Sequence, residues 1–190
     1  TYYKSCLERL NGDWGREEER AQRVDMLEYQ INELTKAYKK YGAEVFFIVI
    51  PNSQTVYSEK MPEYMGEISN DTRLKSTTRY LKKRGITNYL DLTDTLIAAK
   101  ENGELYNNTE DSLNSRGAYY AYLAVLDMLP KEVRAELPVY ELKDADLVKH
   151  TTDGKVLARL VSLEDKIKNR TVSLSSDFVQ KNPAQKHHVT

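Results

Sequence analysis

A run of six apolar residues that ends at a proline constrains the fold more than any other feature of this sequence. The run occupies residues 45–50, reads VFFIVI, and is followed by Pro51. Branched and aromatic side chains favour strands, and an uninterrupted apolar run is typical of a strand buried on both faces. Proline has no N–H to continue a strand ladder. We therefore expect a strand over 45–50, covered on both faces.

A helical pattern leads directly into this strand. Between residues 16 and 41, apolar side chains recur at alternating steps of three and four, at Val24, Leu27, Ile31, Leu34, Tyr38 and Tyr41. This spacing places them on one face of a helix, and Gly42 stands where a helix commonly ends. The stripe is too short to favour a coiled coil over packing on a sheet.

A helix that delivers the chain into a buried strand indicates a layered α/β fold. In such folds, binding sites gather at the carboxyl ends of the strands. This rule directs attention to residues 51–54, and we take Asn52 as a candidate substrate-binding residue.

A second helix followed by a strand, and then further helices, are expected along the chain. We expect a helix that Asn70 caps and Gly85 ends, then a strand over 86–92 and a short helix over 95–100. An apolar helix should begin at Asn114 or Ser115 and stop at Pro130. The last third is weaker in pattern, with a helix over 155–163 and a strand over 171–174. We find no repeat or linker and expect one domain over residues 1–190.

Composition removes several classes of function. Charged residues form 30% of the chain but nearly cancel, to a formal net charge of −1, so nothing indicates a nucleic-acid partner. A lone cysteine, Cys6, and three histidines, His150, His187 and His188, show no spacing typical of a metal site. We expect no metal and no cofactor. No stretch of about 20 apolar residues indicates a membrane span.

Three segments, in order along the chain, carry a resemblance to a known family. The first reads FIVIPNSQTVY over 47–57, with Met61-Pro62 after it; the second reads TEDSLNSRGAYYAY over 109–122; the third reads GKVLARL over 154–160. Together they resemble the bacterial DHHW family, which is named for an Asp-His-His-Trp motif and is similar to alginate O-acetyltransferases of the SGNH hydrolase superfamily. The resemblance implies a flavodoxin-like sheet flanked by helices, and an exported protein of the bacterial cell envelope.

The second segment keeps the frame of the family's motif but changes its chemistry. By position, Glu110 replaces the Asp, Asp111 and Ser112 replace the two His, and Leu113 replaces the Trp. The resemblance therefore makes Glu110 and Ser112 the candidate catalytic positions. A serine nucleophile needs an imidazole to accept its proton, and a Ser112 hydroxyl has no basic site near neutral pH. The resemblance implies that the family's own nucleophile, in a Gly-Asp-Ser turn, lies beyond this chain, and that the chain holds an incomplete form of the family's fold.

Other side chains allow a functional or a structural interpretation. Tyr119 and Tyr122 are candidate substrate-binding residues because aromatic rings stack on sugars, although their helical spacing also fits core packing. His150, without matched spacing, fits a surface or core residue better than a catalytic base. The Ser and Asp side chains of residues 175–177 fit a turn, since they bond readily to nearby backbone.

Three functional hypotheses remain open at this level. The first is a domain of the carbohydrate O-acetyltransferase or esterase type that has lost its activity. The second is a non-catalytic module that binds cell-envelope carbohydrate. The third is a protein-interaction domain without a small ligand, which would present an exposed apolar patch instead of a polar groove.

Overall fold

The structure is a computed structural model, and it describes residues 12, 14–65, 69 and 71–182. Cys6, Asn70, His187 and His188 therefore lie outside the described residues. Contacts within the chain divide it into two compact units, residues 1–94 and 95–190, and each is described by itself. Among the described helices, none is long and apolar enough to cross a bilayer.

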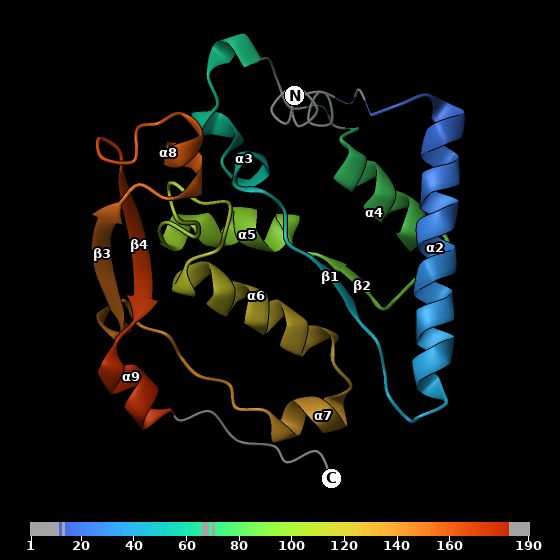
Figure 1. Ribbon diagram of the computed structural model, residues 1–190. Coiled ribbons are helices and arrows are strands. Elements are labelled where there is room, and N and C mark those ends of the chain that lie inside the picture. Colours follow the sequence, from blue (N-terminus) through green and yellow to red (C-terminus); the bar gives the residue numbers. More distant parts are fainter. Residues whose placement is uncertain (1–11, 13, 66–68, 70, 183–190) are drawn as a thin grey trace. The chain divides into compact units, whose positions relative to one another are not determined.

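Short strands stand between groups of helices along the chain (Figure 1). The elements are α2 (Glu17–Lys39), β1 (Phe47–Val49), α3 (Ser53–Val56), α4 (Arg73–Lys83), β2 (Tyr89–Asp91), α5 (Thr93–Ala99), α6 (Ser115–Met128), α7 (Lys131–Glu136), β3 (Leu147–Asp153), α8 (Val156–Leu160), β4 (Lys168–Leu174) and α9 (Ser176–Lys181). Short 3₁₀ turns occupy Ser58–Lys60, Glu63–Met65, Lys100–Asn102 and Asp144–Asp146.

The first unit places two helices on a small parallel sheet. Strands β1 and β2 pair with Phe47 opposite Tyr89 and Val49 opposite Asp91. The apolar face of α2 meets α4 through Val24, Ile31 and Leu81, and Phe47 and Tyr89 pack against this cluster. The expected helix and the α/β class are confirmed. Only the first half of the predicted stripe, Val24, Leu27 and Ile31, packs in the core, whereas Leu34, Tyr38 and Tyr41 are exposed.

The first strand is shorter and more accessible than the sequence indicates. Only residues 47–49 join the ladder; all three are half-buried, and Ile50 is 54% exposed. The expectation of a strand buried on both faces was wrong. A hydrogen bond from the Asn88 side chain to the Val45 carbonyl oxygen, at 2.9 Å, holds the start of the run outside the ladder.

Helix ends in this unit follow local hydrogen bonding. Gly42 and Gly85 take positive φ angles of 71° and 76° just after α2 and α4, a conformation that a Cβ would strain. Thr72, and not the expected Asn70, caps α4 by accepting a hydrogen bond from the Lys75 N–H. Helix α5 begins at Thr93, two residues earlier than expected, because the Asp91 carboxylate accepts from the Thr93 N–H at 3.0 Å.

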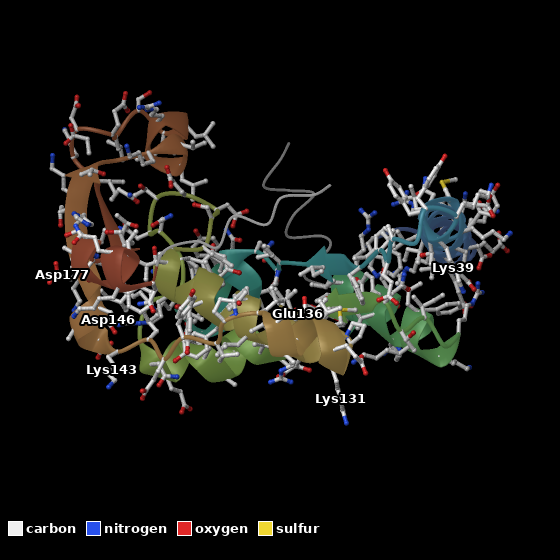
Figure 2. The ribbon with its side chains drawn as sticks, turned by 90° about the horizontal axis from the view of Figure 1, so that it is seen from below. Lys39, Lys131, Glu136, Lys143, Asp146 and Asp177 are labelled. Atoms are coloured by element: carbon white, nitrogen blue, oxygen red, sulfur yellow. The ribbon has the colours of Figure 1, made fainter. Side chains whose placement is uncertain are left out.

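The second unit combines α6 with an antiparallel hairpin. Strands β3 and β4 pair along their whole length, with Leu147 opposite Leu174 and Asp153 opposite Lys168, and β4 packs on α6. Sequence analysis found only the end of β4 and missed β3 and α7. Strand β3 is almost entirely exposed, so it carries no apolar alternation to reveal it. Figure 2 marks both ends of α7, Lys131 and Glu136.

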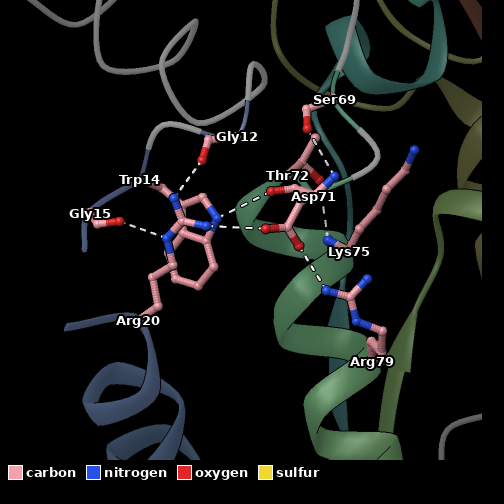
Figure 3. Close-up of polar contacts among 9 residues, drawn as sticks. All are labelled: Gly12, Trp14, Gly15, Arg20, Ser69, Asp71, Thr72, Lys75 and Arg79. Atoms are coloured by element: carbon pink, nitrogen blue, oxygen red, sulfur yellow. Dashed lines mark hydrogen bonds and ion pairs between the residues drawn. The ribbon is translucent and has the colours of Figure 1, made fainter. Parts of the chain in front are cut away.

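One half-buried arginine ties the segment before α2 to the segment before α4 (Figure 3). The Arg20 guanidinium donates to the carbonyl oxygens of Gly15 at 2.6 Å and Gly12 at 2.8 Å, and to the Asp71 carboxylate at 3.1 Å. It also lies 4.8 Å from the ring centroid of Trp14, whose side chain is only 5% exposed and donates to the Asp71 carbonyl oxygen. Arg79 binds the other carboxylate oxygen of Asp71 at 2.7 Å.

We expect Arg20→Ala to destabilise the first unit by about 1–3 kcal/mol, because two backbone carbonyls and a carboxylate lose a charged donor. Arg16→Ala is the matched control: among the described residues, the Arg16 side chain pairs with Glu19 at the surface, a contact worth about 0–1 kcal/mol. Urea unfolding followed by tryptophan fluorescence checks this, since Trp14 is the chain's one tryptophan. Equal midpoints for the two variants would contradict the role given to Arg20.

Candidate functional site

The loop between Gly103 and α6 carries the altered motif, and backbone bonds fold it into a narrow hairpin. Tyr106 and Leu113 form an antiparallel bridge. The Asn107 N–H donates to the Ser112 carbonyl oxygen at 3.0 Å. Residues 108–111 therefore form the tip, a position that suits their polar side chains.

Glu110 and Ser112 face each other across this tip. The Ser112 hydroxyl donates to Oε2 of Glu110 at 3.3 Å. The Asn107 amide nitrogen lies 3.3 Å from the same carboxylate oxygen and 2.9 Å from the Ser112 hydroxyl, so it bridges the two. The structure thus brings together the two positions that the resemblance selects. Asn107 was not among the candidate site residues, because an asparagine beside a turn is common and carries no distinctive signal.

Asn114 joins this loop to α6. Its side chain caps the helix by accepting from the Gly117 N–H at 3.0 Å, as sequence analysis expected for Asn114 or Ser115. Its amide nitrogen donates to the Glu104 carbonyl oxygen at 2.7 Å. One buried side chain therefore fixes both the start of the helix and the base of the loop.

Gly117 allows the helix and the loop to approach closely. A Cβ at this position would lie 2.3 Å from the Leu105 carbonyl oxygen and 2.9 Å from the Leu113 side chain. The glycine of the GAYYAY stretch is therefore required by packing.

Tyr119 and Tyr122 turn their hydroxyls toward the protein. Tyr119 donates to the Tyr140 carbonyl oxygen at 2.9 Å, and Tyr122 donates to the Pro138 carbonyl oxygen at 2.7 Å. Both rings are half-buried. The bonds fasten the segment after α7 to α6, which is a structural role; whether the ring faces also contact a sugar stays a prediction.

Asn52 lies in the first unit, at the carboxyl end of β1. Its side-chain oxygen accepts from the Thr55 N–H at 2.9 Å and from the Thr55 hydroxyl at 2.6 Å, and so caps α3. It also lines a cavity of about 300 Å³, whose wall includes Leu27, Ile50 and Leu74. The polar residue expected at the end of the strand thus borders a hollow of mixed apolar and polar lining.

The remaining candidates have structural partners. His150 is exposed on β3, and its Nε2 lies 2.6 Å from the Ser173 hydroxyl on β4. Ser175 caps α9 by accepting from the Phe178 N–H at 3.1 Å, which agrees with the interpretation of this serine as a backbone-binding residue. Among the described residues, no group of three His, Cys, Asp or Glu side chains gathers as metal ligands would.

The α/β elements fit the class to which comparison with known families assigns the chain, the SGNH hydrolase-like domains. Residues 11–188 match the family model described as "SGNH hydrolase-like domain, acetyltransferase AlgX", and the chain therefore belongs to this family. The similarity to alginate O-acetyltransferases expected from sequence is confirmed, while the narrower DHHW assignment stays a prediction. A search of curated proteins found no match.

Two solved structures are similar to this chain. The O-acetyltransferase domain of Pseudomonas putida AlgJ shares 15% identity and a TM-score of 0.54, over 87% of this chain and 62% of that one. Bacillus cereus PatB1 shares 18% identity and a TM-score of 0.47, over 75% of this chain and 45% of that one. The first supports the fold. The chain spans less than two thirds of either structure's length.

The close approach of Gly117 to Leu105 predicts a change in stability for Gly117→Ala that is opposite in sign to the one helix propensity predicts. Replacing a helical glycine by alanine normally stabilises a helix by about 1 kcal/mol. We expect Gly117→Ala to destabilise the chain by about 1–3 kcal/mol instead, because the new Cβ overlaps the Leu105 carbonyl. Thermal unfolding followed by circular dichroism measures this; Ala118→Gly, at an exposed position, is the control for propensity alone. A stabilised Gly117→Ala variant would contradict the packing.

A second prediction tests the geometry of the altered motif. We expect Ser112→His to place an imidazole against the Glu110 carboxylate, and this opposite charge should raise the imidazole pKa above its ordinary value. The double variant Ser112→His/Glu110→Gln should lack the elevation. Proton NMR titration of the histidine signals compares the two variants. Equal pKa values would mean that Glu110 does not face position 112 in solution.

Proposed function

We propose that this chain is a domain of the carbohydrate O-acetyltransferase type that keeps the family's motif frame without the catalytic imidazole. The observation that carries the proposal is the contact between Glu110 and Ser112, at 3.3 Å. In a working dyad, the carboxylate would hold an imidazole, and the imidazole would accept the proton of a nucleophilic serine. Here the carboxylate holds a hydroxyl, which cannot act as a general base.

We further propose that the protein is bacterial and is exported to the cell envelope, where its carbohydrate partner would be found. This proposal rests on the resemblance and on family membership. Similarity to the AlgJ domain extends over 62% of that chain, so the activity of the whole protein to which this domain belongs is likewise a proposal.

Hydrolysis of p-nitrophenyl acetate by the purified chain tests the loss of catalysis. We expect a rate no greater than that of the Glu110→Ala variant, because without an imidazole the carboxylate at position 110 activates nothing. Any hydrolysis should then come from surface nucleophiles and stay unchanged in Glu110→Ala and Ser112→Ala. Steady turnover that Glu110→Ala abolishes would refute the proposal.

A second candidate function is a carbohydrate-binding module. The cavity at the carboxyl end of β1 favours it: about 300 Å³, with Asn52 and Thr55 beside apolar Leu27 and Ile50. Such a mixture suits a sugar ring, which has apolar faces and polar edges. A panel of bacterial envelope oligosaccharides at millimolar concentration, read by ligand-observed NMR, tests it. Binding that is weakened by Ile50→Ser, a change at an exposed residue of the cavity wall, would support this function. A lack of binding to every oligosaccharide of the panel would refute it.

A further inference from the structure

Thr109, the residue before Glu110, is bound to a strand sixty residues further along the chain. Its backbone N–H and its hydroxyl both donate to the side-chain oxygen of Asn169 on β4, at 3.2 and 2.7 Å. Thr109 and Asn169 are each only 3% exposed. Hydrogen bonds in such a dry setting are costly to lose, since water does not replace them.

The remaining polar groups of Thr109 meet the turn that opens α8. Its hydroxyl accepts from the Lys155 N–H at 3.0 Å, and its carbonyl oxygen accepts from the Leu157 N–H at 3.0 Å. The backbone and side chain of this one residue are thus saturated by two separate segments. Segments outside the loop, β4 and the start of α8, therefore fix the position of Thr109. They also fix the direction of the backbone that leads into Glu110.

Asn108 extends the same attachment by one residue. Its side-chain amide donates to the Lys168 carbonyl oxygen at 3.0 Å, and its side-chain oxygen accepts from the Arg170 N–H. Its own N–H donates to the Arg170 carbonyl oxygen at 3.4 Å. Residues 108 and 109 are therefore attached to β4 mainly through side-chain hydrogen bonds, with Asn169 between the two backbone partners of Asn108.

We infer that Asn169 is a positioning residue for the candidate site, and that its buried amide holds the loop so that Glu110 faces position 112. This inference rests on the proposed function, which assigns the site to positions 110 and 112. Among the described contacts, Asn169 touches neither the Glu110 carboxylate nor the Ser112 hydroxyl. It acts on them through Thr109. The hairpin β3–β4 thereby contributes to the geometry of the site.

The experiment uses Ser112→His as background, because the elevated pKa of the introduced imidazole reports the nearness of Glu110. Asn169→Ala removes both hydrogen bonds that the Asn169 side chain accepts from Thr109. Thr109→Val removes the Thr109 hydroxyl, and with it the bonds to Asn169 and to the Lys155 N–H. We expect either change to lower the imidazole pKa to the value of Ser112→His/Glu110→Gln. Thr109→Ser keeps the hydroxyl and should keep the elevation. Ser173→Ala, on the same strand but bonded to His150, should keep it as well.

Circular dichroism distinguishes a loss of positioning from a loss of folding. Only variants that retain the helical signal of the parent are compared. Should Asn169→Ala fail to fold, the pair Thr109→Val and Thr109→Ser decides. An elevation that persists in folded Thr109→Val overturns the inference but leaves the proposed function standing. Absence of any elevation in Ser112→His itself contradicts the placement of Glu110 in the proposed function, and so removes the basis of both.

Discussion

A polar loop keeps one shape only if hydrogen bonds replace the apolar contacts that it lacks, and this constraint governs the candidate site. Residues 108–111 offer no apolar side chain to a core. Thr109 and Asn169 meet in a nearly dry environment and satisfy each other, and Asn114 satisfies the base of the same loop. Because an unsatisfied buried amide costs about 1–3 kcal/mol, these few bonds favour a single arrangement. The close approach of Gly117 to Leu105 then brings α6 against that arrangement.

In the proposed function, the residues at the motif positions change its chemistry, while the side chains at positions 110 and 112 stay in contact. Glu110 keeps a carboxylate, and the side chain at position 112 still points at it. What is missing is a group whose proton affinity lies near neutral pH, and a hydroxyl cannot supply it. Under that proposal, an acetyltransferase-type fold persists without the acid-base group. The tyrosine hydroxyls bonded to the 138–140 segment further support a scaffold held for its shape.

Prediction from sequence succeeded where the signal is local. The spacing of Val24, Leu27 and Ile31 defined α2, and Asn114 was correctly placed at the start of α6. Prediction failed where the structure of a segment depends on contacts with segments distant in sequence. The apolar run over 45–50 looks like a fully covered strand, yet three residues pair and Ile50 is exposed. Strand β3 is polar and exposed, and it exists because β4 supplies its hydrogen-bond partners.

The sequence by itself determined the class of fold, the course of α2 and the start of α6, since periodicity, capping and residue identity are properties of short segments. Only the tertiary structure decided that Glu110 faces Ser112, that Asn107 bridges them, and that Asn169 fixes the loop. These contacts depend on the direction of individual side chains and on pairs of residues up to about sixty positions apart. A hydrogen bond between such residues leaves no periodic trace along the chain, because its geometry arises only when the segments are packed.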